Sequence, residues 1–301
     1  MIELDGFLKL STEEVAHLVR ASGPKVCVFP INGTRRWFTL EYGSQSFDDP
    51  IKAYMDISGK RHIELYKLFF DHGVDTLLTP VIGPEILATR DAYMQKIGGE
   101  GLARLVTHPD FVSFYDEYDV RVRFYGEYRT NLAETPYEYL SDLFDGIVQQ
   151  TNQHKRFRLF FGAFADNLNS TQVAASYAVE YYKKLGIIPD QKAIVEMYYG
   201  EYIEKADIFI GFDRFSAFDY PFLNSGEEDL YFTIAPSMYM TERQLRSIIY
   251  DHLYLRRDTD ADYSSFSASD LNSLRNYYLE NRDASYGVGS RFYGVWIPQR
   301  Q

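Results

Sequence analysis

The chain has one cysteine among its 301 residues, Cys27. A lone cysteine excludes an intramolecular disulfide and any metal site built from several cysteines, and it suits a reducing compartment. Cys27 lies in the apolar segment of residues 26–29. We therefore expect its thiol to be buried and unreactive.

Long apolar runs are also missing. No stretch approaches the ~18 consecutive apolar residues of a membrane span. The first five residues, Met-Ile-Glu-Leu-Asp, lack the basic and then apolar pattern of a signal peptide. These two absences predict a soluble, cytoplasmic protein without a membrane span.

Positive charge is in deficit, with 31 Lys and Arg against 43 Asp and Glu and a net charge of −12. A nucleic-acid-binding protein needs a basic face, so we expect no nucleic-acid partner. Nucleotide-binding glycine patterns, a serine-hydrolase elbow and zinc spacing among the six histidines are absent as well. The arginines of such an acidic chain fit a focused anion pocket.

Aromatic residues, in contrast, are abundant: 26 Tyr, 22 Phe and 2 Trp make up 17% of the chain. Most must build the core, for which 46% apolar content is ample. The remainder could line a pocket for a large apolar ligand, where ring faces can stabilise a passing carbocation.

Short apolar runs alternate with longer helical patterns throughout the chain, without repeats or linkers. This order predicts an α/β fold, a mostly parallel central sheet flanked by helices, with ligands at the C-terminal ends of the strands. We expect one domain over residues 1–301, whose C-terminal helices (about 241–301) pack on the domain or on a dimer partner. Strands are expected at 26–29, 76–81, 120–125, 156–161, 208–212 and 230–233, and helices at 50–72, 84–105, 137–150, 171–185, 191–199, 242–255 and 268–281.

The turn after the first expected strand has the composition of a diphosphate cradle. Backbone N–H groups at Gly33 and Thr34 can face phosphate oxygens. Arg35 and Arg36 can add charge-assisted hydrogen bonds. The alternative is a surface turn with two solvated arginines.

Several segments, in this order, resemble the cis-prenyltransferases, the undecaprenyl diphosphate synthase-like enzymes. Their first strand ends in Asp-Gly-Asn-Gly-Arg-Trp, where this chain has Asn-Gly-Thr-Arg-Arg-Trp from Asn32 to Trp37. Arg214-Phe215-Ser216 resembles their Arg-x-Ser diphosphate clamp, and Asp229 begins a segment similar to their closing Glu-Leu-Tyr-Phe. The resemblance implies the cis-prenyltransferase fold, a homodimer, and Arg214 and Ser216 as diphosphate ligands.

A narrower group with this fold fits better still, the tuberculosinyl adenosine transferase and diterpene alcohol synthase group. The shared segments are 23–26, 33–38, 198–202, 210–216 and 250–252. The resemblance implies ionisation of a bicyclic diterpenyl diphosphate and capture of the allylic cation by water or adenosine. It also implies that Tyr93 faces the cation or the acceptor.

Position 32 departs from the family, which has Asp there to help hold Mg²⁺. Asn32 is neutral and a poorer Mg²⁺ ligand, although its amide can donate to a phosphate oxygen. Three readings stay open: an enzyme that works with Asn32 and relies on arginine, a deliberately inactivating substitution, or a diphosphate binder that catalyses poorly. Asp229 is the carboxylate expected to bind Mg²⁺ if the ion binds; the alternative is a cap at a strand start.

The acidic pair Asp48-Asp49 is not a DDxxD metal box, because position 52 is Lys52. Asp49 could act electrostatically beside the developing cation, or simply begin a helix. Pro50 stands where tuberculosinyl adenosine transferase has Tyr, which favours water over adenosine as the acceptor, unless Tyr54 substitutes.

Elements that chain-elongating relatives use for isopentenyl diphosphate are missing, which argues against elongation. The sequence thus predicts a diterpene synthase that releases a tertiary alcohol and diphosphate. Transfer to adenosine is one alternative, and a non-catalytic diphosphate-binding subunit is another. Asn32, Arg35, Arg36, Tyr93 and Asp49 are the predicted catalytic residues.

Overall fold

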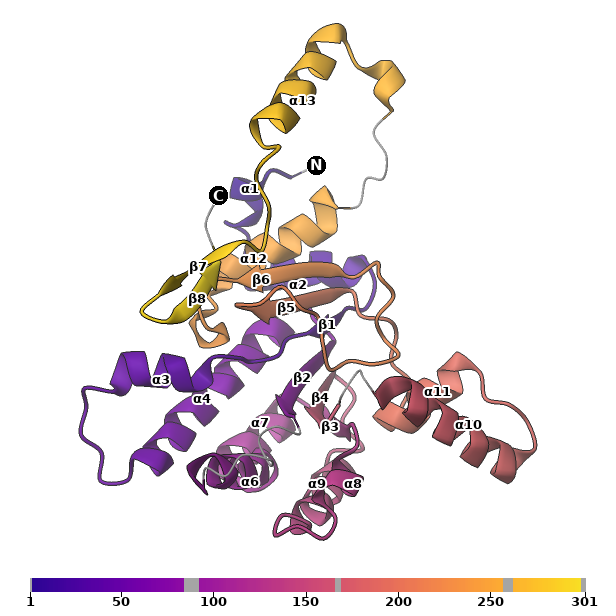
Figure 1. Ribbon diagram of the computed structural model, residues 1–301. Helices are drawn as coiled ribbons and strands as arrows, with labels where there is room; N and C mark the ends of the chain where they lie inside the picture. Colours follow the sequence, from indigo (N-terminus) through magenta and orange to yellow (C-terminus); the bar gives the residue numbers. More distant parts are fainter. Residues whose placement is uncertain (1, 84–91, 166–168, 257–261, 299–301) are drawn as a thin grey trace.

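The structure is a computed structural model that describes residues 2–83, 92–165, 169–256 and 262–298, with side chains from residue 97 onward after the first gap (Figure 1). Its centre is a six-stranded sheet in the order β3-β4-β2-β1-β5-β6, and every neighbouring pair is parallel. The predicted mostly parallel α/β fold is confirmed. The strands are β1 (Val26–Val28), β2 (Thr76–Ile82), β3 (Val120–Tyr125), β4 (Phe157–Ala163), β5 (Ile208–Phe212) and β6 (Asp229–Thr233).

Side chains of the central strands alternate between two cores, because successive residues of a strand point to opposite faces. On β1, Cys27 belongs to the larger core, while Val26 and Val28 belong to the smaller one. Both faces of the sheet are therefore covered, which explains why these strands read as continuous apolar runs.

The larger core is built from stacked and tilted aromatic rings. Phe70 stacks on Phe157 with ring centroids 4.5 Å apart, and Phe114 stacks on Tyr66 and Phe70. Aromatic rings thus make up a large part of this core. The contributing helices are α1 (Leu4–Phe7), α2 (Thr12–Ala21), α3 (Thr34–Tyr42), α4 (Pro50–Asp71), α6 (Ala92–Thr107), α7 (Pro109–Glu117), α8 (Tyr128–Leu132), α9 (Tyr139–Gln150) and α12 (Glu242–Tyr250).

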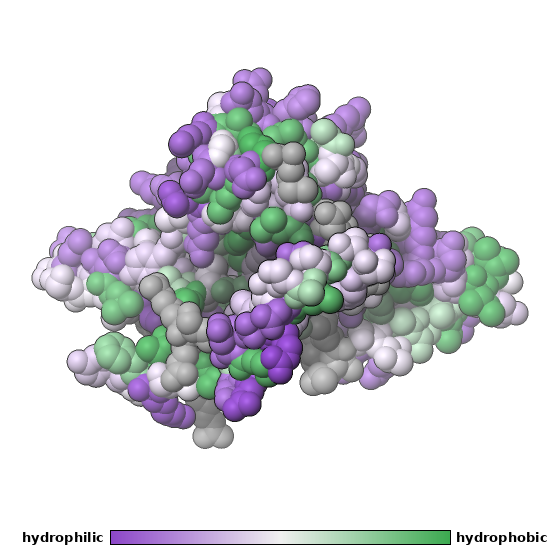
Figure 2. Space-filling view, turned by 90° about the horizontal axis from the view of Figure 1, so that it is seen from above, coloured by the Kyte–Doolittle hydropathy of each residue, from purple (hydrophilic) through white to green (hydrophobic). Residues whose placement is uncertain are grey.

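The smaller core lies under α10 (Ser170–Leu185) and α11 (Gln191–Tyr199). Tyr198 and Tyr199 are buried there, whereas α10 buries Val173 alone among its residues. Figure 2 shows apolar side chains gathered at the right-hand end of the molecule, where α10 and α11 lie in Figure 1. The exposed apolar residues of this end are Val179, Tyr182, Leu185, Ile187 and Ile188.

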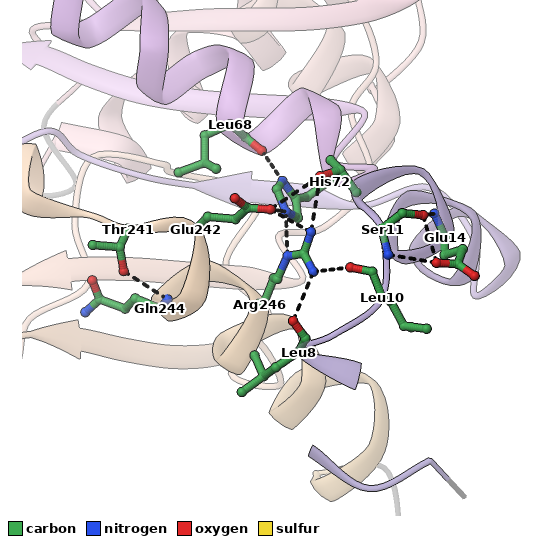
Figure 3. Close-up of polar contacts among 11 residues, drawn as sticks. Leu8, Leu10, Ser11, Glu14, Leu68, His72, Thr241, Glu242, Gln244 and Arg246 are labelled. Carbon is green, nitrogen blue, oxygen red and sulfur yellow. Dashed lines mark hydrogen bonds and ion pairs between the residues drawn. The ribbon is translucent and has the colours of Figure 1, made fainter. Parts of the chain in front are cut away.

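The N-terminal segment, which includes α1 (Leu4–Phe7), is held to the body by the buried Arg246 of α12 (Figure 3). Its Nη1 donates to the carbonyl oxygens of Leu8 and Leu10 at 3.3 and 2.5 Å. Its Nε donates to His72 Nε2 at 3.2 Å, and its Nη2 pairs with Glu242 at 2.6 Å. One guanidinium thus joins three segments that are distant in sequence.

The C-terminal region contacts the sheet where His252 meets Asp229 of β6, and it extends away from the sheet in the helix of residues 268–280 (Figure 1). It contains a π-helical turn (Asp251–Leu255), a 3₁₀ turn (Tyr263–Ser265), α13 (Ala268–Glu280) and the antiparallel pair β7 (Gly289–Phe292) and β8 (Val295–Pro298). α12 packs against α1, but α13 has no buried residue. Packing of α13 on a dimer partner, and the description of residues 1–301 as one domain, stay predictions.

Among the described residues, no helix combines the length and the apolar character needed to cross a bilayer.

Candidate active site

The predicted cradle forms at the C-terminal end of β1, where α3 (Thr34–Tyr42) begins. Gly33 precedes the helix with a φ of 77°. A Cβ at this position would lie 2.8 Å from the Phe212 ring and 2.9 Å from Pro236, so only glycine fits both the conformation and the space. No side chain caps the helix, and its first turn carries no acidic residue. Its first backbone N–H groups are therefore suited to an anion.

Asn32 is fixed through its backbone. Its N–H donates to Ser237 Oγ at 3.1 Å, and the Ser237 N–H donates back to the Asn32 carbonyl oxygen at 3.1 Å. Ser237 opens a 3₁₀ turn (Ser237–Tyr239) that follows β6. The chain after β6 thus sets the position of the residue that departs from the family pattern.

Arg36 connects the cradle to the predicted clamp. Its guanidinium pairs with Asp213 at 3.3 Å and lies over the Phe212 ring, 5.2 Å from the centroid. Asp213 directly precedes Arg214 and has a φ of 71°. The structure therefore brings the two diphosphate segments implied by the resemblance together at one edge of the sheet.

Arg214 and Ser216 are exposed, as is Arg35. The Ser216 N–H donates to the Arg214 carbonyl oxygen at 2.9 Å, which curves the segment into a tight turn. The Arg214 guanidinium makes no ion pair within the described residues. Its charge is thus not neutralised by any of these residues.

A cavity of about 330 Å³ begins at Asn32 and Thr34 and extends between β2, α4 and α6. This volume lies at the low end of the range for small-molecule sites, ~300–1,000 Å³. Most of its walls are apolar. The apolar lining residues are Ile31, Met55, Pro80, Val81, Ile82, Ile97, Leu102, Leu105, Phe111 and Phe218.

Polar side chains line the α4 wall of this cavity at a spacing of four residues. Tyr54, Ser58 and His62 share one face of the helix because such residues stack along it. Sequence reasoning had named Tyr54 but missed Ser58 and His62. The sequence pattern could have shown Ser58 and His62, because they and Tyr54 interrupt the apolar face of an otherwise amphipathic helix.

The glycines of α6 leave room on its side of the cavity, because they have no side chains. Gly98 and Gly101 line the cavity, and a Cβ added at Gly101 would meet no atom within 4 Å. Arg104, one turn further on, also lines the cavity and pairs with Asp56 of α4. This ion pair lies at one side of the cavity, and its opposite charges largely cancel.

Asp49 caps α4. Its Oδ1 accepts hydrogen bonds from the N–H groups of Ile51 and Lys52, both at 3.0 Å, and it is exposed. It is not among the residues that line the cavity. The helix-start reading accounts for this geometry, and an electrostatic role beside a cation stays a prediction. Tyr93 falls in α6, but its side chain lies outside the described residues.

Asp229 stands at the other edge of the sheet from the cradle. It begins β6, about four residues or ~13 Å of strand before the C-terminal edge. Its Oδ2 lies 2.7 Å from His252 Nδ1, and its Oδ1 lies 3.7 Å from Arg256. Asp229 therefore does not face Asn32 across the cradle.

The residues at the cradle do not fit a Mg²⁺ site. The described part of the chain has no cluster of three or more acidic, His or Cys residues that could hold a metal ion. Asn32 supplies a neutral amide, and Asp213, the nearest carboxylate to the cradle with a contact to it, is engaged by Arg36. A Mg²⁺ requirement stays a prediction, and no step below depends on the ion.

Solved structures share this fold. Lavandulyl diphosphate synthase from Lavandula x intermedia, solved with dimethylallyl diphosphate, matches with a TM-score of 0.56 and 14% identity over 82% of this chain and 98% of that chain. A probable undecaprenyl diphosphate synthase from Campylobacter jejuni matches with a TM-score of 0.56 and 11% identity over 80% and 99%. At these identities the likeness shows the fold alone, which is that of the cis-prenyltransferases.

Sequence relatives narrow the class. Tuberculosinyl adenosine transferase of Mycobacterium tuberculosis is 42% identical over 97% of this chain and 97% of its own. (+)-Kolavelool synthase of Herpetosiphon aurantiacus is 24% identical over 93% of this chain and 91% of its own. No family model matches. The chain belongs to the family of tuberculosinyl adenosine transferase. The resemblance drawn from the sequence and the prediction of an enzyme are both confirmed.

Proposed function

We propose that this enzyme ionises a bicyclic diterpenyl diphosphate and that water captures the allylic cation, releasing a tertiary diterpene alcohol and diphosphate. One observation carries the proposal. The start of α3 adjoins a mainly apolar cavity, because Asn32 and Thr34 are among the residues that line that cavity. A polar head group and a hydrocarbon tail are thus accommodated side by side.

The cradle would lower the barrier by meeting the negative charge that develops on the leaving diphosphate. The N–H groups at the start of α3 and the Arg36 guanidinium are held in place before the reaction, which is what makes such donors effective, and Arg35 would add its charge. Arg214 and Ser216 would close over the second phosphate. The Asn32 amide can donate where a family Asp would accept.

The cavity would protect the cation until capture. Its aliphatic walls would limit contact with water once substrate fills the cavity, and the rings of Phe111, Phe218 and Tyr54, which also line it, could stabilise positive charge. A carbocation formed next to bulk solvent would instead be quenched without control of position.

Transfer of the diterpenyl group to adenosine is the second candidate, favoured by the name of the 42% identical relative. The two candidates share the ionisation step and differ in the nucleophile. A homodimer and a cytoplasmic location are proposed from the resemblance and from composition.

Product analysis by mass spectrometry tests the proposal. The enzyme is incubated with a bicyclic diterpenyl diphosphate, with and without adenosine and Mg²⁺, and compared with its Asn32→Asp variant. A diterpene alcohol whose yield is unchanged by adenosine is expected. A nucleoside adduct would establish the second candidate. Binding of the diphosphate without any product would overturn both, and activity gained only by Asn32→Asp would mark Asn32 as an inactivating residue.

A further inference from the structure

His62 lines the cavity, and its hydrogen bonding defines which ring nitrogen carries the lone pair. Its Nδ1 lies 2.7 Å from the Ser58 carbonyl oxygen of the preceding helical turn. A carbonyl oxygen can only accept, so Nδ1 carries the hydrogen and Nε2 carries the lone pair. Within the described residues, no group forms a hydrogen bond with Nε2.

The surroundings keep this ring neutral. Burial lowers the pKa of His62, although the hydrogen bond to Ser58 opposes this effect. The edge-on ring of Tyr66 lies 6.2 Å from the His62 ring, and Tyr54 and Arg104, which pairs with Asp56, line the same cavity. Asp219 lines the cavity from the loop after β5. The Asp56–Arg104 pair adds little net charge.

We propose that His62 Nε2 is the base that takes the proton from the capturing water. This inference rests on the proposed function, since it concerns the step after ionisation. The substrate C–O bond breaks and its electron pair leaves with the diphosphate. A water oxygen then forms a new C–O bond to the cation, and one proton of the resulting oxonium passes to the Nε2 lone pair.

A base inside the cavity would prevent the capture by water from being reversed. A protonated alcohol can lose water again and return to the cation, so removal of the proton commits the product. Water needs such a base, whereas an attacking neutral ring nitrogen of a nucleoside has no proton to lose. His62 therefore favours water as the nucleophile. General-base assistance of this kind typically contributes a factor of about 10²–10⁴.

The test replaces the base but keeps a polar side chain of similar reach. In His62→Gln, single-turnover formation of the alcohol from a bicyclic diterpenyl diphosphate should fall about 100-fold or more, with substrate affinity within a factor of about three. His17→Gln, which removes an exposed histidine of α2, is the matched control and should behave as the parent. An unchanged rate in His62→Gln would overturn the proposal.

Positional isotope exchange separates this step from ionisation. With ¹⁸O in the bridging position of the substrate, an ionisation that recombines after the released diphosphate has rotated moves the label to a non-bridging position. Exchange relative to product should rise in His62→Gln, because ionisation continues and capture is slowed. A parallel fall of exchange and product would assign His62 a merely structural role. Absence of both in the parent enzyme would instead refute the proposed function itself.

The pH profile of the parent enzyme provides a measurement that no folding defect can obscure. Nε2 is a base only while unprotonated, so alcohol formation should fall as the pH drops through the lowered pKa of His62, with a midpoint below 6.5. The acidic limb should be missing in any folded variant without the imidazole. A flat parent profile between about pH 5 and 8 would overturn the assignment.

Discussion

The two edges of the central sheet are built from opposite chemistry. At the N-terminal edge, aspartates accept hydrogen bonds from the chain itself. Asp75 accepts from the N–H of Lys25 at 3.2 Å, and Asp207 accepts from the N–H of Val26 at 2.8 Å. Asp119 accepts from two N–H groups that precede β4, and Asp229 contacts His252 at 2.7 Å. These carboxylates stabilise the starts of the strands through contacts within the chain.

At the C-terminal edge the same sheet offers donors. Gly33 and Thr34 begin a helix that no side chain caps, and Arg35 and Arg214 lie exposed beside it. The contrast is between aspartates whose hydrogen-bond partners lie at the starts of the strands and arginines that stand exposed at the C-terminal ends of the strands. By this criterion Asp229 belongs with the aspartates of the structural edge, although the resemblance suggests a metal ligand.

The largest effect should come from breaking the structural network around Arg246. In Arg246→Ala, the partly buried carbonyl groups of Leu8 and Leu10 and the buried His72 ring lose their donor, and the free energy of unfolding should fall by about 3 kcal/mol. Urea denaturation measures this. Arg243→Ala, on the exposed face of α12, is the control and should change stability by less than about 0.5 kcal/mol. Equal stabilities of the two variants would contradict the assigned role.

On the functional edge, Arg35→Ala should lower turnover by about 100-fold or more while leaving stability nearly unchanged, because one preorganised donor to the leaving group is lost. Steady-state kinetics and thermal unfolding give the two readouts. Arg275→Ala removes the same charge from exposed α13 as a control. Turnover of Arg35→Ala within a factor of about two of the parent would defeat the assignment.

Filling the cavity should change substrate choice. Gly101→Leu places a side chain in the space that the glycine leaves open, so turnover of a bicyclic diterpenyl diphosphate should fall about tenfold or more. A monoterpenyl diphosphate, with half the carbon atoms, should be much less affected. Gly146→Leu makes the same change on the exposed side of α9, where a Cβ also meets nothing within 4 Å. Equal losses for both substrates would indicate damage to the fold.

The smallest effect on activity is expected at Asp229. Asp229→Asn weakens the contacts to His252 and Arg256 and should cost about 1–2 kcal/mol of stability. Turnover and its response to Mg²⁺ should stay within a factor of about two of the parent. A large loss of turnover that added Mg²⁺ restores would return Asp229 to the role of metal ligand, and would show that the two edges are not chemically separate.

The order of the central strands and helices could be predicted because each has its own pattern of apolar residues. β3, β5 and α11 have the predicted bounds, and α4 differs by one residue. Short helices were missed: α3, α7 and α8 have five to nine residues, too few for a clear period. The β7–β8 pair was missed because its strands have four residues each and no buried residue, so their sequence shows no alternation of apolar and polar positions.

The cradle was predictable and the cavity was not. Gly33 to Arg36 are adjacent in sequence, so a local pattern shows them. Asp213 reaches Arg36 across 177 positions, and no local pattern predicts that pairing. The cavity arises from the separation of β2, α4 and α6, and from glycines whose contribution is the absence of a side chain. The role of His62 likewise depends on which helix face turns inward.

The buried thiol of Cys27 has a practical consequence for the study of this enzyme. It is shielded in β1, with 1% of its surface exposed, and burial raises its pKa. Thiol-directed reagents react with the thiolate, so they should leave the native chain unmodified. A cysteine introduced at an exposed position of α3 or α13 would then be the single reactive site. Fluorescent or spin labels could be attached there without removing any native residue.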